Sequence, residues 1–150
     1  MTETLMIPAD VESPSGTLEW RITLARPLVG FSSSRHFRLH GLGDAYLPFL
    51  GLSSLDEPQL SFIVVAPGLL FSDYVVQIEE SDVELLGLAR PEEALVVVLV
   101  TRRAGSVPTV NLMGPLIINQ HNGIGTQIVL QDARYEVAVP VDAPSALGGR

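Results

Sequence analysis

The sequence contains no cysteine, no lysine and no apolar run long enough to cross a bilayer. The lack of cysteine excludes disulfides, thiolate metal ligands and a cysteine nucleophile. All 9 basic residues are arginine, which by itself indicates no function. The longest uninterrupted apolar run is 94–100, far short of the roughly 20 residues that span a membrane. We therefore expect no membrane association.

Positive charge is also scarce, because 17 acidic residues outweigh 9 basic ones and the formal net charge is −8. Direct nucleic-acid binding is not expected, since phosphate backbones bind to cationic protein faces. An acidic protein is instead steered toward a basic protein partner. Residues 1–12 lack the basic and apolar regions of a secretory signal, so a soluble, cytoplasmic protein is expected.

The chain has 150 residues, 47% of them hydrophobic, which is enough for one folded domain with a substantial core. Residues 1–16 are predicted to form a loose N-terminal leader and residues 140–150 a flexible C-terminal tail. This leaves a single domain at 17–139. Within it, residues 18–24 alternate apolar and polar side chains as a half-buried strand does. Residues 95–101 (LVVVLVT) do not alternate and are expected to be buried on both faces.

Short strand-like segments separated by proline and glycine turns dominate the sequence. We therefore predict a mostly β fold, with a small antiparallel or mixed sheet folded into a barrel-like shape. One short helix is expected near residues 81–87. Ser81 is its expected cap, Glu84 stands at the capping-box spacing, and Gly87 is expected to end it.

The segment NLMGPLIIN, which runs from Asn111 to Asn119, carries a Gly-Pro pair in the middle of an apolar run. Proline has no N–H for a β-ladder, so the segment is predicted to be two extended pieces joined by a bend. Both asparagines then lie at strand ends, where an amide can bond to local backbone or bridge neighbouring turns. The Asn122-Gly123 pair predicts a hairpin loop between the strands that flank it.

No sequence motif for catalysis, cofactor binding or metal binding is found, and none of these is predicted. His36 and His40 have a metal-ligand spacing, but they lie in a strand-like stretch with no third ligand nearby. Ordinary surface histidines are therefore expected. Two alternatives stay open: a barrel that binds a small ligand, and an uncharacterised small β enzyme that uses a histidine with Asp44 or Asp73.

Two acidic stretches are candidate contacts for a protein partner. Glu79 and Glu80 begin a run of acids that fits either helix capping or the docking of a basic partner. Asp73 and Tyr74 lie in the stretch FSDY, and exposed aromatic residues are typical interface anchors. The same stretch also fits a structural role, in which the aromatic side chain covers the core and the acid forms a turn.

NLMGPLIIN, followed by GTQIVL, resembles the pattern N-L-x-x-P-[IL]-[IV]-[IV]-N and then G-x-Q-[IV]-[IV]-L of the flagellar assembly factor FliW family. Upstream, PFLGLSSLDEPQLSFIVVAPGLLFSDYVVQI is similar to the family's P-F-x-x-L-x-S-L-x-[DE]-P-x-L-x-F segment and the D-Y that follows it. The order and spacing of these segments hold from about residue 29 to residue 135. No single motif is specific, whereas the ordered set is.

The resemblance implies a non-enzymatic, mostly β protein of the bacterial cytoplasm. Proteins of this family bind newly made flagellin. They also bind CsrA, an RNA-binding translational regulator, and relieve its repression of flagellin translation by an allosteric antagonism. Flagellin and CsrA are thus the expected partners. The expected partner-binding residues, with the two asparagines as conformational supports or contacts, are Asp73, Tyr74, Glu79, Glu80, Asn111 and Asn119.

Overall fold

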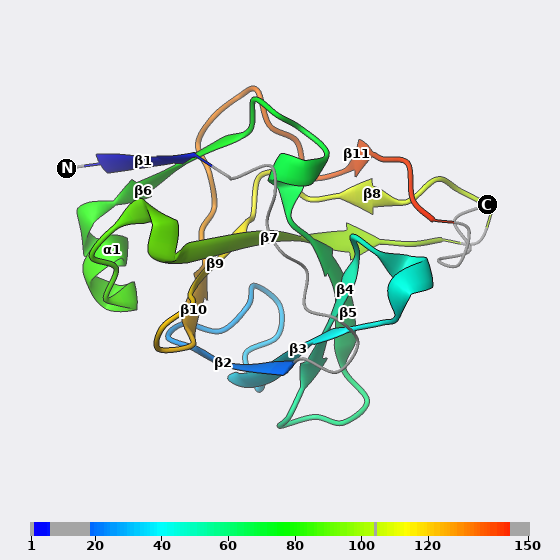
Figure 1. Ribbon diagram of the computed structural model, residues 1–150, viewed down its shortest axis with the longest axis horizontal. Coiled ribbons are helices and arrows are strands. Elements are labelled where there is room, and N and C mark those ends of the chain that lie inside the picture. Colours follow the sequence, from blue (N-terminus) through cyan, green and yellow to red (C-terminus); the bar gives the residue numbers. More distant parts are fainter. Residues whose placement is uncertain (1, 7–18, 104, 145–150) are drawn as a thin grey trace.

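The computed structural model describes residues 2–6, 19–103 and 105–144 (Figure 1). Its described part is mostly β, with one α-helix and three short 3₁₀ turns, as the sequence predicts. The strands are β1 (Thr2–Met6), β2 (Glu19–Leu24), β3 (His36–Gly41), β4 (Leu50–Ser54), β5 (Ser61–Val65), β6 (Val75–Glu79), β7 (Ala94–Thr101), β8 (Thr109–Val110), β9 (Leu116–Asn119), β10 (Ile124–Gln127) and β11 (Val139–Pro140). The helix is α1 (Glu80–Leu86), and the 3₁₀ turns are η1 (Asp44–Tyr46), η2 (Pro67–Leu69) and η3 (Pro91–Glu93).

Seven of the strands close into a barrel. The order around it is β7-β5-β4-β3-β2-β10-β9, and β9 returns to pair with β7. Every neighbouring pair is antiparallel except β2 and β10, which run parallel, so the sheet is mixed. Closure leaves no free edge on these seven strands. β8 and β11 extend the sheet beyond the far half of β7.

Strand β7 is buried on both faces, which confirms the prediction from its lack of alternation. Leu95 and Val97 point into the barrel, where they join apolar residues of β2, β3, β4, β5 and β9. Val96 and Val98 point outward, yet they are buried as well, because they belong to a second apolar cluster outside the barrel. Figure 1 shows β7 as a long strand that crosses most of the molecule.

The second cluster attaches a small outer layer to the barrel. Strand β6 pairs antiparallel with β1, and α1 follows β6 directly. Val76 and Ile78 of β6 and Leu86 of α1 are fully buried against the outward side chains of the barrel, including Ile117. Burying each of these side chains contributes roughly 1.5–3 kcal/mol. The β1–β6 pair and α1 lie at one end of the molecule, on the left in Figure 1.

Helix α1 differs at its start from the expectation. It begins at Glu80 with Glu79 as the N-cap residue, and no side chain caps it, so the Ser81 cap predicted from the capping-box spacing is wrong. Its end is as predicted: Gly87 has φ of 70°, and the N–H groups of Gly87 and Leu88 donate to the carbonyls of Glu84 and Val83. No helix in the described part of the chain is long and apolar enough to cross a membrane.

Strands of the structure overlap both of the expected end segments. Residues 2–6, expected in a loose leader, form β1, whereas 7–16 lie outside the described residues. The boundary expected before residue 140 falls inside β11, where Pro140 pairs with Thr109. Val141 is buried and its N–H donates to Pro108 O. Pairing with distant strands, which local composition does not reveal, makes these ends part of the fold.

Candidate partner-binding site

A groove of about 350 Å³ separates the outer layer from the segment 128–135. Segment 128–135 and the chain that enters β6 arch side by side at the top of Figure 1. Val75, Gln77 and Glu79 line one wall from β6, and Asp82 of α1 closes one end. The other wall is built from Ile128, Val129, Leu130, Gln131, Asp132, Arg134 and Tyr135.

The bend in NLMGPLIIN positions this second wall. Asn111 Oδ1 accepts the N–H groups of Met113 and Gly114 at 3.0 and 3.1 Å, which fixes the bend as a tight Asx turn. Gln127 Nε2 donates to Gly114 O at 3.0 Å. Backbone bonds from Ile128 to Pro115 O and from Leu130 to Met113 O then lay the segment along the bend. The predicted bend and the local amide bonds of Asn111 are thus confirmed.

Asn119, at the other end of that motif, is 2% exposed and joins the hairpin to the helix. Its Nδ2 donates to Leu86 O at 2.9 Å and Gly87 O at 3.3 Å, and its Oδ1 accepts the His121 N–H at 2.8 Å. Asn122 Nδ2 adds a bond to Leu86 O at 3.1 Å. These amides satisfy carbonyls at the C-terminus of α1, where the helix itself provides no donors. Asn119 is therefore placed as a support, and its side chain has almost no surface to offer a partner.

The Asn122-Gly123 hairpin is present between β9 and β10, with Ile118 opposite Gly125. Gly123 has φ of 75°, and an added Cβ would stand 2.6 Å from Arg21 O, so the turn and the neighbouring strand both require glycine. Strand β10 begins at Ile124, directly after the turn.

Tyr74 lies in the core, and the structure places it among the buried residues at 1% exposure. Its hydroxyl donates to Leu112 O at 2.6 Å, and its ring packs on Tyr135 with 4.7 Å between ring centroids. Burial raises the pKa of Tyr74 above its ordinary value, with the neighbouring Tyr135 adding to the effect. Tyr74 therefore supports Tyr135, which lines the groove, and its own side chain has almost no exposed surface.

The remaining predicted acids lie on the surface around the groove. Asp73, Glu79 and Glu80 are all exposed. Asp82 forms an ion pair with Arg26, which reaches it from the chain after β2. Counting Glu84 and Asp132, six acids surround the groove and α1, against the two arginines Arg26 and Arg134. This end of the molecule therefore carries much of the protein's negative charge.

Arg134 is held by its neighbours rather than free to offset that charge. It donates to Asp132 through Nε and Nη2, at 3.0 and 2.6 Å, and its guanidinium lies 5.2 Å from the centre of the Tyr135 ring. The hydrogen bond to Asp132 raises the pKa of Arg134, with smaller contributions from Tyr135 and Asp73. The same bond lowers the pKa of Asp132. Asp73 is thus electrostatically coupled to this pair.

The sequence analysis did not single out Asp132, Arg134 or Tyr135. The local signal was an aspartate two residues before an arginine, which the structure shows as an Asx turn with Arg134 N–H donating to Asp132 Oδ1 at 2.9 Å. That signal predicts a turn and gives no information about the surface that the turn faces. Tyr135 lies before β11, which begins only at Val139, and its ring packs on Tyr74.

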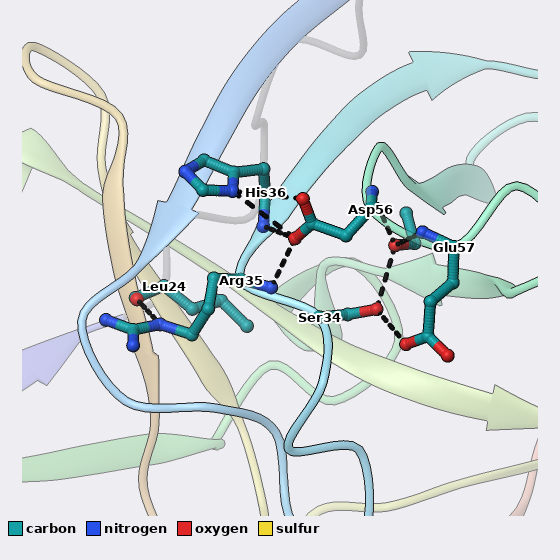
Figure 2. Close-up of polar contacts among 7 residues, drawn as sticks. Leu24, Ser34, Arg35, His36, Asp56 and Glu57 are labelled. Carbon is teal, nitrogen blue, oxygen red and sulfur yellow. Dashed lines mark hydrogen bonds and ion pairs between the residues drawn. The ribbon is translucent and has the colours of Figure 1, made fainter.

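A second polar cluster ties the chain before β3 to the turn after β4 (Figure 2). Ser54 Oγ accepts the N–H groups of Asp56 and Glu57 at 3.1 and 2.9 Å, and lies 2.9 Å from Ser34 Oγ. The Ser34 hydroxyl also donates to the Glu57 carboxylate. Both serines are buried. The S-L-D-E-P part of the upstream motif therefore folds its own turn and has a structural role.

Asp56 fastens the same turn to the start of β3. Its Oδ2 accepts the N–H groups of Arg35 and His36 at 2.7 and 2.9 Å, and Oδ1 lies 3.2 Å from His36 Nδ1. Figure 2 shows the carboxylate facing both donors. The backbone bonds from Arg35 and His36, in that order, lower the pKa of Asp56.

This cluster should make stability depend on pH. Because the folded-state pKa of Asp56 lies below its unfolded value, the carboxylate stabilises the fold above about pH 4 and loses that contribution as the pH falls through the folded pKa. We expect urea unfolding of the wild type to show a steeper loss of stability below about pH 4 than the Asp56→Asn variant. Asp132→Asn serves as the comparison, because Asp132 is a second carboxylate whose pKa is lowered in the folded protein. Identical slopes in wild type and Asp56→Asn would contradict the role of Asp56.

The histidines do not gather around a metal. His36 faces Asp56, His40 Nε2 lies 2.9 Å from Ser53 Oγ, and His121 lies 3.8 Å from Glu93. Within the described ranges there is no group of three or more side chains that could hold a metal ion. No bond joins a described histidine to Asp44 or Asp73.

Comparison with known proteins agrees with this fold and these motifs. The family model described as FliW protein matches residues 10–141. The flagellar assembly factor FliW of Treponema pallidum is 36% identical over 126 residues, covering 83% of each chain. That of Magnetococcus marinus is 37% identical over 123 residues, covering 78% of this chain and 75% of the other.

A solved structure extends the agreement to three dimensions. The crystal structure of a flagellar assembly factor FliW superposes with a TM-score of 0.74 at 25% identity, covering 80% of this chain and 84% of the other. The family match spans the barrel, β6, α1 and both walls of the groove. The chain belongs to the FliW family of flagellar assembly factors.

Proposed function

We propose that this protein binds flagellin in the bacterial cytoplasm and, when released from it, binds CsrA and antagonises its repression of flagellin translation. Membership of the FliW family supports the proposal, because curated relatives are named as flagellar assembly factors. In this role the protein acts by binding and not by catalysis. Export of flagellin would then free the protein to act on CsrA.

The observation that carries the proposal at the level of residues is the acidic end formed by β6 and α1. Asp73, Glu79 and Glu80 are exposed there, around a groove of about 350 Å³. Glu79 has no ion-pair partner among the described residues. A regulator that binds RNA presents basic surface, which an acidic face attracts and orients.

The small-ligand alternative gains no support from the barrel interior. Apolar side chains of six of its seven strands occupy it, and Leu24, Phe37, Leu39 and Leu52 are entirely buried there. The enzyme alternative required a histidine paired with Asp44 or Asp73, and the described histidines have other neighbours. A binding role is the function that the described residues support best.

Calorimetric titration tests the proposal directly. The purified chain is titrated into the CsrA homologue of its own host, first alone and then with flagellin present. We expect binding to CsrA that flagellin suppresses. If the heat of binding to CsrA is the same with and without flagellin, the partner switch is ruled out. Absence of binding to either protein, with a folded sample, would rule out both proposed partners.

Charge reversal locates the contact. We expect Glu79→Arg with Glu80→Arg to weaken CsrA binding by about tenfold, the effect of losing roughly 1.4 kcal/mol of charge attraction. The melting temperature should stay nearly unchanged, because both side chains are exposed.

Asp44→Arg is the matched control, since Asp44 lies on η1 (cyan, on the right of Figure 1), away from α1. Asp44→Arg changes the net charge by as much as Glu79→Arg or Glu80→Arg alone. It should bind CsrA like the wild type. Equal binding by the double variant and the wild type would remove Glu79 and Glu80 from the interface.

A further inference from the structure

The edge of β6 that faces the groove carries unpaired backbone groups. Val75 N–H donates to Tyr135 Oη at 3.1 Å and so points away from β1. Backbone N–H and C=O groups alternate between the two edges of a strand from one residue to the next. Val76 and Ile78 therefore bond toward β1, and Gln77 directs its N–H and C=O into the groove.

No backbone bond from Gln77 toward the groove is formed within the described residues. The opposite wall follows β6 closely only at Tyr135, whose hydroxyl takes up the Val75 N–H. The groove between the two walls has a volume of about 350 Å³. Natural proteins usually cover or blunt such an edge, because it is a ready template for another strand.

The floor and the charges of the groove favour one kind of occupant. Val75, Ile128 and Leu130 provide apolar surface, while Glu79, Asp82 and Asp132 place carboxylates along it. Arg134 is the one cation among the lining residues, and it is bound to Asp132. A strand that alternates apolar and basic side chains would match both features.

We propose that an extended segment of a protein partner, alternating apolar and basic residues, adds to β6 as a new strand, with its backbone paired to Gln77. This inference rests on the proposed function for the identity of the partner, since it describes how a flagellar partner docks in the groove. In this arrangement the main-chain hydrogen bonds provide the affinity, and the acids around the groove provide specificity for a basic segment.

The decisive variant is Gln77→Pro with Gln77→Ala as its matched control. Proline removes the N–H that faces the groove and places its ring there, while the bonds of Val76 and Ile78 to β1 remain. Alanine removes the side chain but keeps the backbone donor. Thermal melts of both variants test whether the fold is retained.

The first probe is a nine-residue capped peptide of alternating arginine and valine, and its counterpart of alternating glutamate and valine. We expect the basic peptide to slow hydrogen exchange of the Gln77 amide at least tenfold and to bind Gln77→Ala like the wild type. Gln77→Pro should lose at least tenfold in affinity, and the acidic peptide should not bind. A folded Gln77→Pro that binds the basic peptide normally would overturn the proposal, as would an unprotected Gln77 amide at saturation.

The second probe separates this inference from the proposed function. If CsrA or flagellin binds Gln77→Pro and Gln77→Ala equally, the partner role stands and the added strand is wrong. If the basic peptide protects Gln77 but neither protein binds, the added strand stands and the proposed partners are wrong. Concentration-dependent dimerisation that protects Gln77 without any peptide would assign the edge to a second copy of this chain and overturn the proposal.

Discussion

Replacing Tyr74 by alanine should lower the free energy of unfolding by about 3–5 kcal/mol, the usual cost of removing a large buried aromatic side chain. The variant loses the packing on Tyr135 and the bond to Leu112 O. For a chain of this length, we expect a fall in melting temperature of roughly 10 °C. Urea unfolding followed by circular dichroism measures the change.

Tyr74→Phe separates the ring from the hydroxyl. It keeps the packing and loses one buried hydrogen bond, so a cost of about 1–2 kcal/mol is expected. Since Tyr74 is 1% exposed, Tyr74→Phe should bind CsrA and flagellin like the wild type. A stable Tyr74→Phe that binds tenfold more weakly would return Tyr74 to the interface and contradict its placement in the core.

Replacing Asn119 by alanine should lower the free energy of unfolding by about 2–3 kcal/mol. The side chain joins three backbone groups across the junction of α1 and the β9–β10 hairpin, and its loss removes all three hydrogen bonds and leaves a space where the buried amide lay. We further expect faster hydrogen exchange at the C-terminus of α1 than in the barrel strands, because α1 is too short to persist undocked.

Two variants sharpen this test. Asn122→Ala removes the bond to Leu86 O and the acceptor of the Ile124 N–H, both from an exposed residue, and should cost about 1 kcal/mol. Asn119→Asp keeps the acceptor for His121 N–H but turns a carboxylate toward the carbonyls of Leu86 and Gly87, so it should be at least as damaging as alanine at neutral pH. If Asn119→Ala were no more costly than Asn122→Ala, the helix would not depend on this amide.

These two residues show why a contact surface is hard to predict from sequence. Tyr74 is an aromatic residue next to an acid, and Asn119 is an asparagine at a strand end. Each of these patterns fits an interface residue as well as a buried support. The choice depends on residues far along the chain: Leu112 and Tyr135 enclose Tyr74, and α1 covers Asn119. The acids Glu79 and Glu80 are exposed, so for them the surface interpretation holds.

The sequence by itself determined the features that depend on local backbone chemistry. The bend follows from the missing N–H of Pro115, the hairpin from the positive φ that Gly123 allows, and the helix end from Gly87. The burial of β7 on both faces follows from its unbroken run of apolar side chains. The ordered motifs also determined the family.

Only the tertiary structure decided which strands pair and which surfaces meet. The parallel pairing of β2 with β10, the inclusion of β1 and β11, and the groove between β6 and residues 128–135 all join segments far apart in sequence. Such contacts form because the whole chain must bury two apolar layers at once, one inside the barrel and one outside it. Local pattern fixes which face of a strand is apolar, and the closed fold determines what that face meets.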